Sequence, residues 1–176
     1  YEIKAMGLRL RMETNGTLIG PREARALKDN EVSFSISIDG PDAELHDDLR
    51  GVKGSFKRTL KGTEHIRAEG LSFQVIMSLH RGNLHGLVDM VDFVQDLGAT
   101  SLKINPITLS GRADEMKERG ELLTVAETLD AYHALKQHPS VQDGFLLAFD
   151  VPPAFVDFHE IGQRGFGTCG ILGILG

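Results

Sequence analysis

The chain has 176 residues, enough to bury one hydrophobic core, and its 41% hydrophobic and 25% charged residues are typical of a globular domain. Its net charge of −6 argues against a nucleic-acid or anionic-membrane partner, and no apolar run reaches the roughly 20 residues of a membrane span. The single cysteine excludes an internal disulfide framework, and an N-terminus that does not resemble a signal peptide favours a cytoplasmic location.

The N-terminal part of the chain predicts two strands separated by a helix. Apolar and charged residues alternate over 8–14, which predicts a strand that ends at the turn Asn15-Gly16. Pro21 is expected at the first position of a short helix that extends to residue 28. Apolar residues then alternate with serines over 32–39, which predicts a second strand that stops at a Gly-Pro pair.

Strand and helix patterns continue to alternate in the rest of the chain. They predict helix 55–69, strand 73–79, helix 84–98, strand 101–105, helix 122–136 and a short strand 146–149. Ser55 is the expected N-cap of the first of these helices, and Leu122, Ala126, Leu129 and Tyr132 are expected on the buried face of the last. Strand-then-helix units predict parallel strands with right-handed crossovers, as in half or more of an α/β barrel or in a doubly wound sheet.

A cluster of polar side chains follows the second predicted strand. Asp39 ends that strand and Ser37 lies one step back on the same face, while His46, Asp47 and Arg50 follow on a loop and a short helix. In parallel α/β folds, ligands bind outside the carboxyl ends of the strands, so this cluster is a candidate site. The same rule places Thr14, Asp39, Leu79 and Asn105, at the ends of four predicted strands, on one rim.

Several short motifs occur in a characteristic order. They are TNGTLI at 14–19, SISIDGP at 35–41, HDDLRG at 46–51, GSF at 54–56, KINPI at 103–107, Gly111-Arg112 and the tail CGILGILG that begins at Cys169. Together they resemble the middle of a radical S-adenosylmethionine (SAM) enzyme, in the group whose C-terminal SPASM region carries extra iron–sulfur clusters, such as the anaerobic sulfatase maturases. The resemblance covers nearly the whole chain.

The resemblance implies an α/β fold, a partial (β/α)6 barrel of the TIM-barrel type. In that family a CxxxCxxC loop after the first strand binds a [4Fe–4S] cluster that chelates SAM and cleaves it to a 5′-deoxyadenosyl radical. The strands predicted here would be the third to sixth of six, so the cysteine loop would precede this chain. The ends of the chain agree, because YEIKAMG reads as the tail of a helix and the apolar run after Cys169 has no partner. We therefore expect an internal fragment of a longer protein.

The resemblance also assigns residues at the strand ends to SAM. These residues are Thr14, Asn15, Ser37, Asp39, Arg50, Ser78 and Asn105. The first two would lie near the methionine moiety, and the next two would hydrogen-bond the ribose hydroxyls or the carboxylate. The arginine would neutralise a carboxylate of SAM or of the substrate. The last two mark strand ends that would supply adenine and methionine contacts.

Some of these residues also suit structural roles. Asn15 favours a simple Asn-Gly turn, because asparagine tolerates a left-handed backbone. Asp39 suits an Asx turn or a helix N-cap. Arg50 could pair with a neighbouring surface aspartate, Asp47 or Asp48, in place of a ligand carboxylate.

Cys169 resembles the first cysteine of the SPASM region, a ligand of an auxiliary iron–sulfur cluster. Taken without the resemblance, a single cysteine is most often a small buried apolar residue. The resemblance therefore divides the chain into an incomplete radical SAM core over 1–150 and, over 151–176, a linker with the truncated start of the SPASM region. Because one thiol cannot hold a cluster, the 176 residues are expected to be inactive by themselves.

The sequence thus predicts the core of a radical SAM enzyme that abstracts hydrogen from a peptide or protein substrate, with an electron donor such as flavodoxin or ferredoxin. Two alternatives stay open. The first is an iron-free (β/α) barrel enzyme that uses Asp39 with His46 or Lys103 as acid and base. The second is a non-catalytic scaffold that kept the barrel. His46 and Asp47 are otherwise predicted to brace the loop after the second strand.

Overall fold

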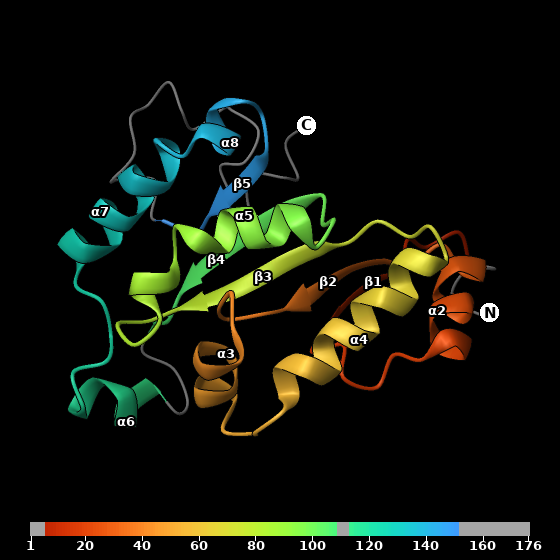
Figure 1. The fold of residues 1–176 in the computed structure, drawn as a ribbon, viewed down its shortest axis with the longest axis horizontal. Helices are drawn as coiled ribbons and strands as arrows, with labels where there is room; N and C mark the ends of the chain where they lie inside the picture. Colours follow the sequence, from red (N-terminus) through yellow and green to blue (C-terminus); the bar gives the residue numbers. More distant parts are fainter. Residues whose placement is uncertain (1–5, 109–112, 152–176) are drawn as a thin grey trace.

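The computed structural model describes residues 6–108 and 113–151. Five parallel strands form one sheet in their chain order, β1-β2-β3-β4-β5 (Figure 1). They are β1 (Arg11–Thr14), β2 (Ser33–Ser37), β3 (Gln74–Leu79), β4 (Ser101–Pro106) and β5 (Leu146–Phe149). The four strands assigned to the barrel are adjacent and parallel, which confirms the prediction. The short fifth strand pairs with β4 and extends the same sheet.

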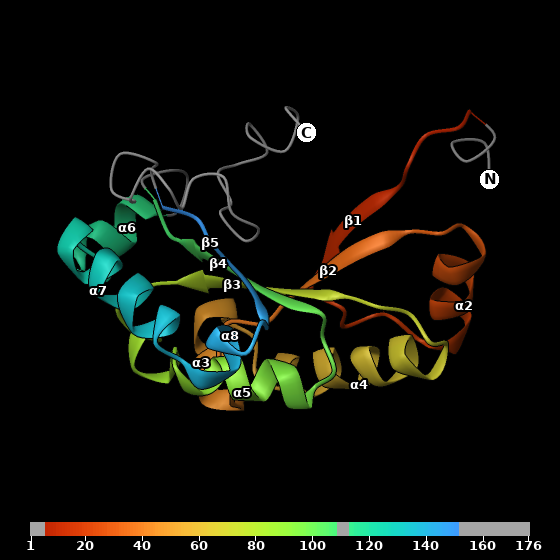
Figure 2. The ribbon, with the colours of Figure 1, turned by 90° about the horizontal axis from the view of Figure 1, so that it is seen from above.

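Helices connect the strands and cover one face of the sheet. They are α2 (Pro21–Asp29), α3 (Ala43–Arg50), α4 (Ser55–Ala68), the 3-10 turn η1 (Leu84–Gly86), α5 (Asp89–Asp96), α6 (Ala113–Glu118), α7 (Val125–Lys136) and α8 (Pro139–Gln142). Figure 2 shows α3, α4, α5 and α8 along one face, while no described helix covers the other face. One-sided coverage is typical of an arc of a barrel and not of a doubly wound sheet. None of the described helices is long and apolar enough to cross a membrane.

The face of the sheet toward the helices forms the hydrophobic core. Ile36, Val75 and Leu102 are partners in register across β2, β3 and β4, and all three are fully buried. They belong to one apolar cluster with Ile66 of α4 and Met90 of α5. Burial of side chains of this size contributes about 1.5–3 kcal/mol each, so this layer holds the helices on the sheet.

The opposite face of the sheet is polar. The Ser35 hydroxyl donates to Gln74 Oε1 at 3.2 Å, and Gln74 Nε2 donates to the Ser101 hydroxyl at 3.0 Å, so a row of hydrogen bonds crosses three strands. Lys103 alternates with two buried residues of β4 and therefore lies on this polar face, beside Ile76 of β3. A polar face inside a closing barrel is suited to line a ligand site.

Several predicted element boundaries differ from the structure. The helix predicted over 84–98 is divided into η1 and α5. Gly86 packs so closely on α3 that a Cβ there would lie 2.6 Å from Leu45 Cδ1, and the tighter turn allows this approach. Helix α7 begins at Val125, after a Thr124–Glu127 capping box. Ala126 is exposed, so its predicted inward position is wrong.

Candidate active site

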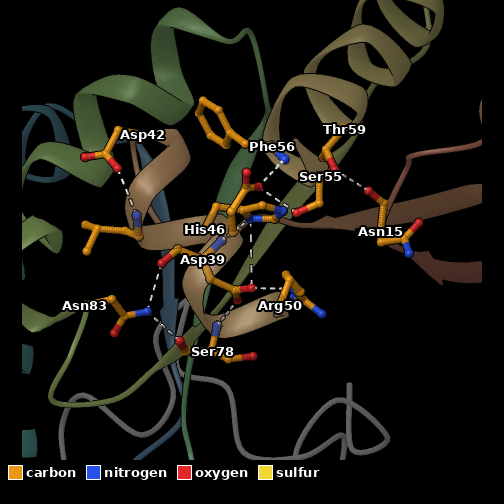
Figure 3. A network of polar contacts seen from close by, with 12 residues as sticks. Asn15, Asp39, Asp42, His46, Arg50, Ser55, Phe56, Thr59, Ser78 and Asn83 are labelled. Carbon is orange, nitrogen blue, oxygen red and sulfur yellow. Dashed lines mark hydrogen bonds and ion pairs between the residues drawn. The ribbon is translucent and has the colours of Figure 1, made fainter. Parts of the chain in front are cut away.

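Asp39 lies at the centre of a polar network at the carboxyl ends of β2 and β3 (Figure 3). Strand β2 ends at Ser37, and Asp39 follows in the turn, where its side chain is fully buried. Asp39 Oδ1 accepts a hydrogen bond from the Ser78 N–H at 2.9 Å, and Oδ2 forms an ion pair with Arg50 Nε at 2.6 Å. Neither predicted surface partner of Arg50 was correct, because α3 turns its last residue back toward the strand end.

Asn83 ties the same turn to the end of β3. Its Nδ2 donates to the carbonyl oxygens of Asp39 and Ser78, at 2.8 and 2.9 Å, and its Oδ1 accepts from the His80 N–H at 2.9 Å. The side chain is fully buried, so these bonds satisfy backbone groups that water does not reach. Asn83 was not among the predicted site residues, because nothing local in the sequence indicates a contact with Asp39.

His46 braces the turn, as predicted. Its ring is 1% exposed, and Nδ1 accepts the Asp39 N–H at 3.1 Å. Burial lowers the pKa of His46 below its usual value of 6.5, an effect that outweighs the opposite influence of the Asp39 carboxylate. An accepting Nδ1 requires the neutral ring, so geometry and pKa agree. A buried, neutral and engaged imidazole is poorly suited to be the solvent-facing base of an iron-free enzyme.

Asp47 caps helix α4 from outside that helix. Its carboxylate accepts from the Phe56 N–H and the Ser55 hydroxyl, both at 2.7 Å, and from the Gly54 N–H. These bonds, led by the one from Phe56, lower the pKa of Asp47 to about 2. Ser55 is therefore the first residue of the helix and not its predicted N-cap. The bracing role predicted for Asp47 is confirmed.

Thr14 and Asn15 form a turn packed against α4. Thr14 Oγ1 accepts from the Gly16 N–H at 3.1 Å, and Asn15 Oδ1 accepts from the Thr17 N–H at 3.1 Å. Gly16 has a positive φ of 72°, and a Cβ on Gly62 of α4 would lie 2.2 Å from the Gly16 carbonyl oxygen. Glycine is thus needed at both positions, one for the backbone angle and the other for the close approach.

A cleft of about 780 Å³ opens at the ends of β3 and β4. One wall carries three of the predicted SAM residues, Arg50, Ser78 and Asn105. Ser78 and Asn105 are partners in register, so the strand pairing brings them together. Among the described residues, the cleft lining does not include Thr14, Asn15, Ser37 or Asp39.

Asn105 carries a polar atom that is suited to a ligand. Its Oδ1 is buried and has no hydrogen-bond partner among the described residues. An unsatisfied buried acceptor costs about 1–3 kcal/mol, which a ligand N–H or O–H would recover. The amino groups and the ribose hydroxyls of SAM are donors of this kind, so the residues of this wall fit that cofactor.

The opposite wall of the cleft is formed by α6 and the residues after it. It carries Glu115, Met116, Arg119 and Glu121, none of which was predicted as a site residue. A helix signal was present in the sequence, because acidic residues in the first turn and Lys117 in the last suit the helix dipole. With Asp48 and Arg50, the described lining holds three carboxylates and two guanidiniums. Burial lowers the pKa of the adjoining His80, which favours its neutral form.

The described residues contain no group of three His, Cys, Asp or Glu side chains able to hold a metal ion. The expected cluster ligand Cys169, the Gly111-Arg112 pair and the region after residue 151 lie outside the described residues.

Residues 1–94 match the sequence model of the Radical SAM superfamily. The chain is similar to the AdoMet-dependent heme synthase of Nitratidesulfovibrio vulgaris, with 38% identity over 122 residues that cover 69% of this chain and 33% of that protein. It is also similar to the PqqA peptide cyclase of Ruegeria pomeroyi, with 27% identity over 168 residues that cover 94% of this chain and 44% of that protein. The chain thus spans a third to under half of these two relatives.

Two solved structures share the fold. SuiB of Streptococcus suis, bound to the precursor peptide SuiA, matches 90% of this chain with a TM-score of 0.69 and 14% identity, over 36% of its own chain. The anSMEcpe enzyme, with bound AdoMet and the Kp18Cys peptide, matches 80% of this chain with a TM-score of 0.64 and 15% identity, over 40% of its own.

Proposed function

The chain belongs to the radical SAM superfamily, and from this premise we propose that it forms part of the barrel of an enzyme that modifies a peptide or protein. In the parent protein, a [4Fe–4S] cluster and SAM supply a 5′-deoxyadenosyl radical that abstracts hydrogen from a substrate side chain. An electron donor such as flavodoxin or ferredoxin reduces the cluster. The 176 residues contain one cysteine, so the CxxxCxxC ligands would come from another part of the parent.

The strand-end wall of the cleft supports this proposal, because it offers a cation for the carboxylate of SAM and a hydrogen-bond acceptor for its amino groups. Arg50 uses Nε toward Asp39, while its side chain is 32% exposed and can still receive a carboxylate. Asn105 Oδ1 lacks a donor, and the Ser78 side chain lies beside it. Asp39 Oδ1 accepts from the Ser78 N–H and Oδ2 is ion-paired with Arg50, so we assign Asp39 to holding Arg50 in place.

The remaining expected contacts stay part of the proposal. Thr14, Asn15 and Ser37 lie at the ends of β1 and β2, on the same rim as the cleft, and we propose that they approach SAM from that side. Cys169 is proposed as a ligand of an auxiliary cluster in the parent. Its replacement by alanine should lower the iron content and leave SAM cleavage at the first cluster intact.

The sharpest test of the site uses Asn105→Ala in the anaerobically reconstituted parent. This change removes an acceptor that has no described partner, so folding should be unharmed while SAM binding weakens about tenfold or more. Asn30→Ala, at the end of α2 and away from the cleft, is the matched control and should bind SAM normally. Equal SAM affinity of both variants would remove Asn105 from the site.

The broader assignment is tested by the reconstituted parent itself. It should bind a cluster and release 5′-deoxyadenosine when reduced, while the isolated 176-residue chain should bind no stoichiometric cluster. A cysteine-replete parent that neither binds iron nor forms 5′-deoxyadenosine would contradict the assignment. An iron-free barrel enzyme would then be the better reading.

Two substrate classes compete within this proposal. The cleft favours a peptide, because its described lining has more carboxylates than guanidiniums and would repel a polyanion. Similarity to heme synthases favours an iron tetrapyrrole, whose carboxylates would need cations. Titration of the parent with an iron coproporphyrin decides between them. Absence of a Soret shift supports the peptide class, whereas stoichiometric binding followed by loss of the substrate's carboxylates would establish the tetrapyrrole class.

A further inference from the structure

We propose that Arg81 is a positioning residue that holds α6 in place as the second wall of the cleft and so controls how the substrate is held. This inference rests on the proposed function, because it assigns the strand-end wall to SAM and the α6 wall to the substrate. Every residue expected to contact SAM lies on a strand end or on α3, and none lies on α6.

Arg81 contacts two residues of the connection between α6 and α7 and one residue in the first turn of α7. Its N–H donates to the Glu121 carbonyl oxygen at 2.8 Å, and its guanidinium donates to the Gly120 carbonyl oxygen. Its Nε and Nη2 donate to Glu127 Oε1 at 3.1 and 2.9 Å, and Nη2 lies 2.6 Å from Oε2. A forked arginine–carboxylate pair restricts orientation as well as distance, so these contacts fix the connection geometrically.

Glu127 performs a second task with the same carboxylate. Its Oε2 accepts from both the N–H and the hydroxyl of Thr124, each at 2.8 Å, which forms the capping box of α7. The Arg81 hydrogen bonds, together with those from Thr124, lower the pKa of Glu127 to about 2. The carboxylate is therefore charged at physiological pH, and one group determines both where α7 begins and where α6 lies.

Among the described residues, little apolar burial holds α6. The helix has six residues and buries only Ala113. Figure 1 shows it beside the carboxyl ends of the strands, joined to α7 by the connection that Arg81 contacts. Since apolar burial normally fixes the position of a helix, α6 depends unusually strongly on these polar contacts.

The loop that carries Arg81, residues 80–83, is fixed firmly on its other side. Asn83 binds the carbonyl oxygens of Asp39 and Ser78 and is fully buried. Arg81 therefore projects from a well-anchored loop beside the SAM wall and contacts the residues that directly follow α6. The loop over residues 80–83 thus connects the strand-end wall of the cleft with the α6 wall.

The α6 wall has the chemistry of a substrate-contacting surface. Arg119 pairs with Glu121 through Nε and Nη2, at 2.5 and 3.1 Å, so its charge is already compensated. Glu115 and Met116 lie beside this pair in the cleft lining. Such a wall offers hydrogen bonds and one apolar contact without a net positive charge, which suits a peptide backbone and side chain.

Hydrogen–deuterium exchange of the parent protein tests the position of α6 without any substrate. Arg81→Gln and Glu127→Gln should each raise exchange in residues 113–124 about tenfold, because local opening becomes easier. Exchange at the Asp39 and Asn83 amides should stay unchanged. Unchanged exchange in 113–124 in both variants would overturn the proposal.

Two control variants test whether the faster exchange in residues 113–124 is specific to the contacts of Arg81. Arg25→Gln breaks another exposed arginine–glutamate pair, with Glu69 at 3.2 Å, and should leave residues 113–124 unaffected. Thr124→Ala removes the capping box but keeps Arg81 on Glu127. It should raise exchange only in the first turn of α7, and a rise in α6 would show that the cap, and not Arg81, positions the wall.

The effect on function is measured by the steady-state kinetics of the parent enzyme, with the substrate class, peptide or tetrapyrrole, that it converts. Arg81→Gln should raise KM for that substrate at least about fivefold, with unchanged SAM affinity and unchanged 5′-deoxyadenosine formation without substrate. Arg81→Lys, which keeps the charge but not the fork, should restore only part of the affinity. An unchanged KM would overturn the positioning role. A parent without SAM cleavage would instead contradict the proposed function, while the exchange result still reports on α6.

Discussion

Two polar networks lie on either side of the loop over residues 80–83, and they differ in burial. On the strand side, the side chains of Asp39 and Asn83 are fully buried, and their hydrogen bonds join groups that are buried or partly buried. On the α6 side, Arg81 and Glu127 are 43% and 34% exposed, and water can replace either partner. The first network should therefore determine whether the rim folds, and the second only where its outer wall lies.

Replacement of Asp39 should have the largest effect. Asp39→Ala leaves the Ser78 N–H without a partner. It also leaves the partly exposed Arg50 guanidinium without its carboxylate. We expect a loss of about 3 kcal/mol in the free energy of unfolding and weaker SAM binding in the parent, measured by urea denaturation and calorimetry. Asp48→Ala, on the exposed side of α3, should change stability by less than about 0.5 kcal/mol. Similar losses in the two variants would contradict the buried role of Asp39.

Asn83→Ala should have the next largest effect. It removes the partner of two carbonyl oxygens and of the His80 N–H, and we expect a loss of about 2 kcal/mol in the free energy of unfolding. Asn83→Asp keeps the acceptor for His80 but lacks the amide donor. If the alanine variant were as stable as the wild type, Asn83 would not connect the two strand ends.

The pH dependence of stability should be smaller. Burial lowers the pKa of His46 and of His80, so the unfolded chain binds protons more readily than the folded one below about pH 6.5. Stability should be complete above that pH and fall as the pH decreases, by at most about 1.4 kcal/mol per pH unit for each group. His46→Asn, whose amide oxygen can replace Nδ1, should flatten this dependence relative to the wild type. Thermal unfolding between pH 7 and 5 measures the difference.

The exposed ion pairs should matter least for stability. Arg25→Gln removes contacts with Asp29 and Glu69, and we expect a change below about 1 kcal/mol in the free energy of unfolding. Arg81→Gln should lower the melting temperature no more than Arg25→Gln does. A much larger decrease in melting temperature for Arg81→Gln would show that the Arg81–Glu127 pair stabilises the fold as strongly as the buried network of Asp39 and Asn83, and would contradict the proposed difference.

Most of the fold could be predicted from local pattern. The alternation in β2 and the apolar segments over 73–79 and 101–105 located these three strands, and the helices between them predicted parallel pairing. The predicted bracing roles of His46 and Asp47 were also correct, because they lie only seven and nine residues from the backbone groups that they bind. Boundaries failed where packing intervened, as at Gly86, which approaches α3 too closely for a regular helix.

Only part of the candidate site could be predicted from local pattern. Ser78 and Asn105 could be named because strand ends meet at one edge of a parallel sheet. The α6 wall could not, since it is a short helix whose place depends on Arg81 and Glu127, 46 positions apart in the chain.

The sequence by itself determined the order of the parallel strands, the polar residues at their ends and the resemblance to a radical SAM barrel. These features follow from local periodicity and from motifs, which need no knowledge of distant contacts. Only the tertiary structure decided that Arg50 pairs with Asp39, that Asn83 binds the Asp39 carbonyl 44 positions away and that α6 lines the cleft. A side chain's partner depends on which elements packing brings within about 3 Å, and that distance is set by the whole core.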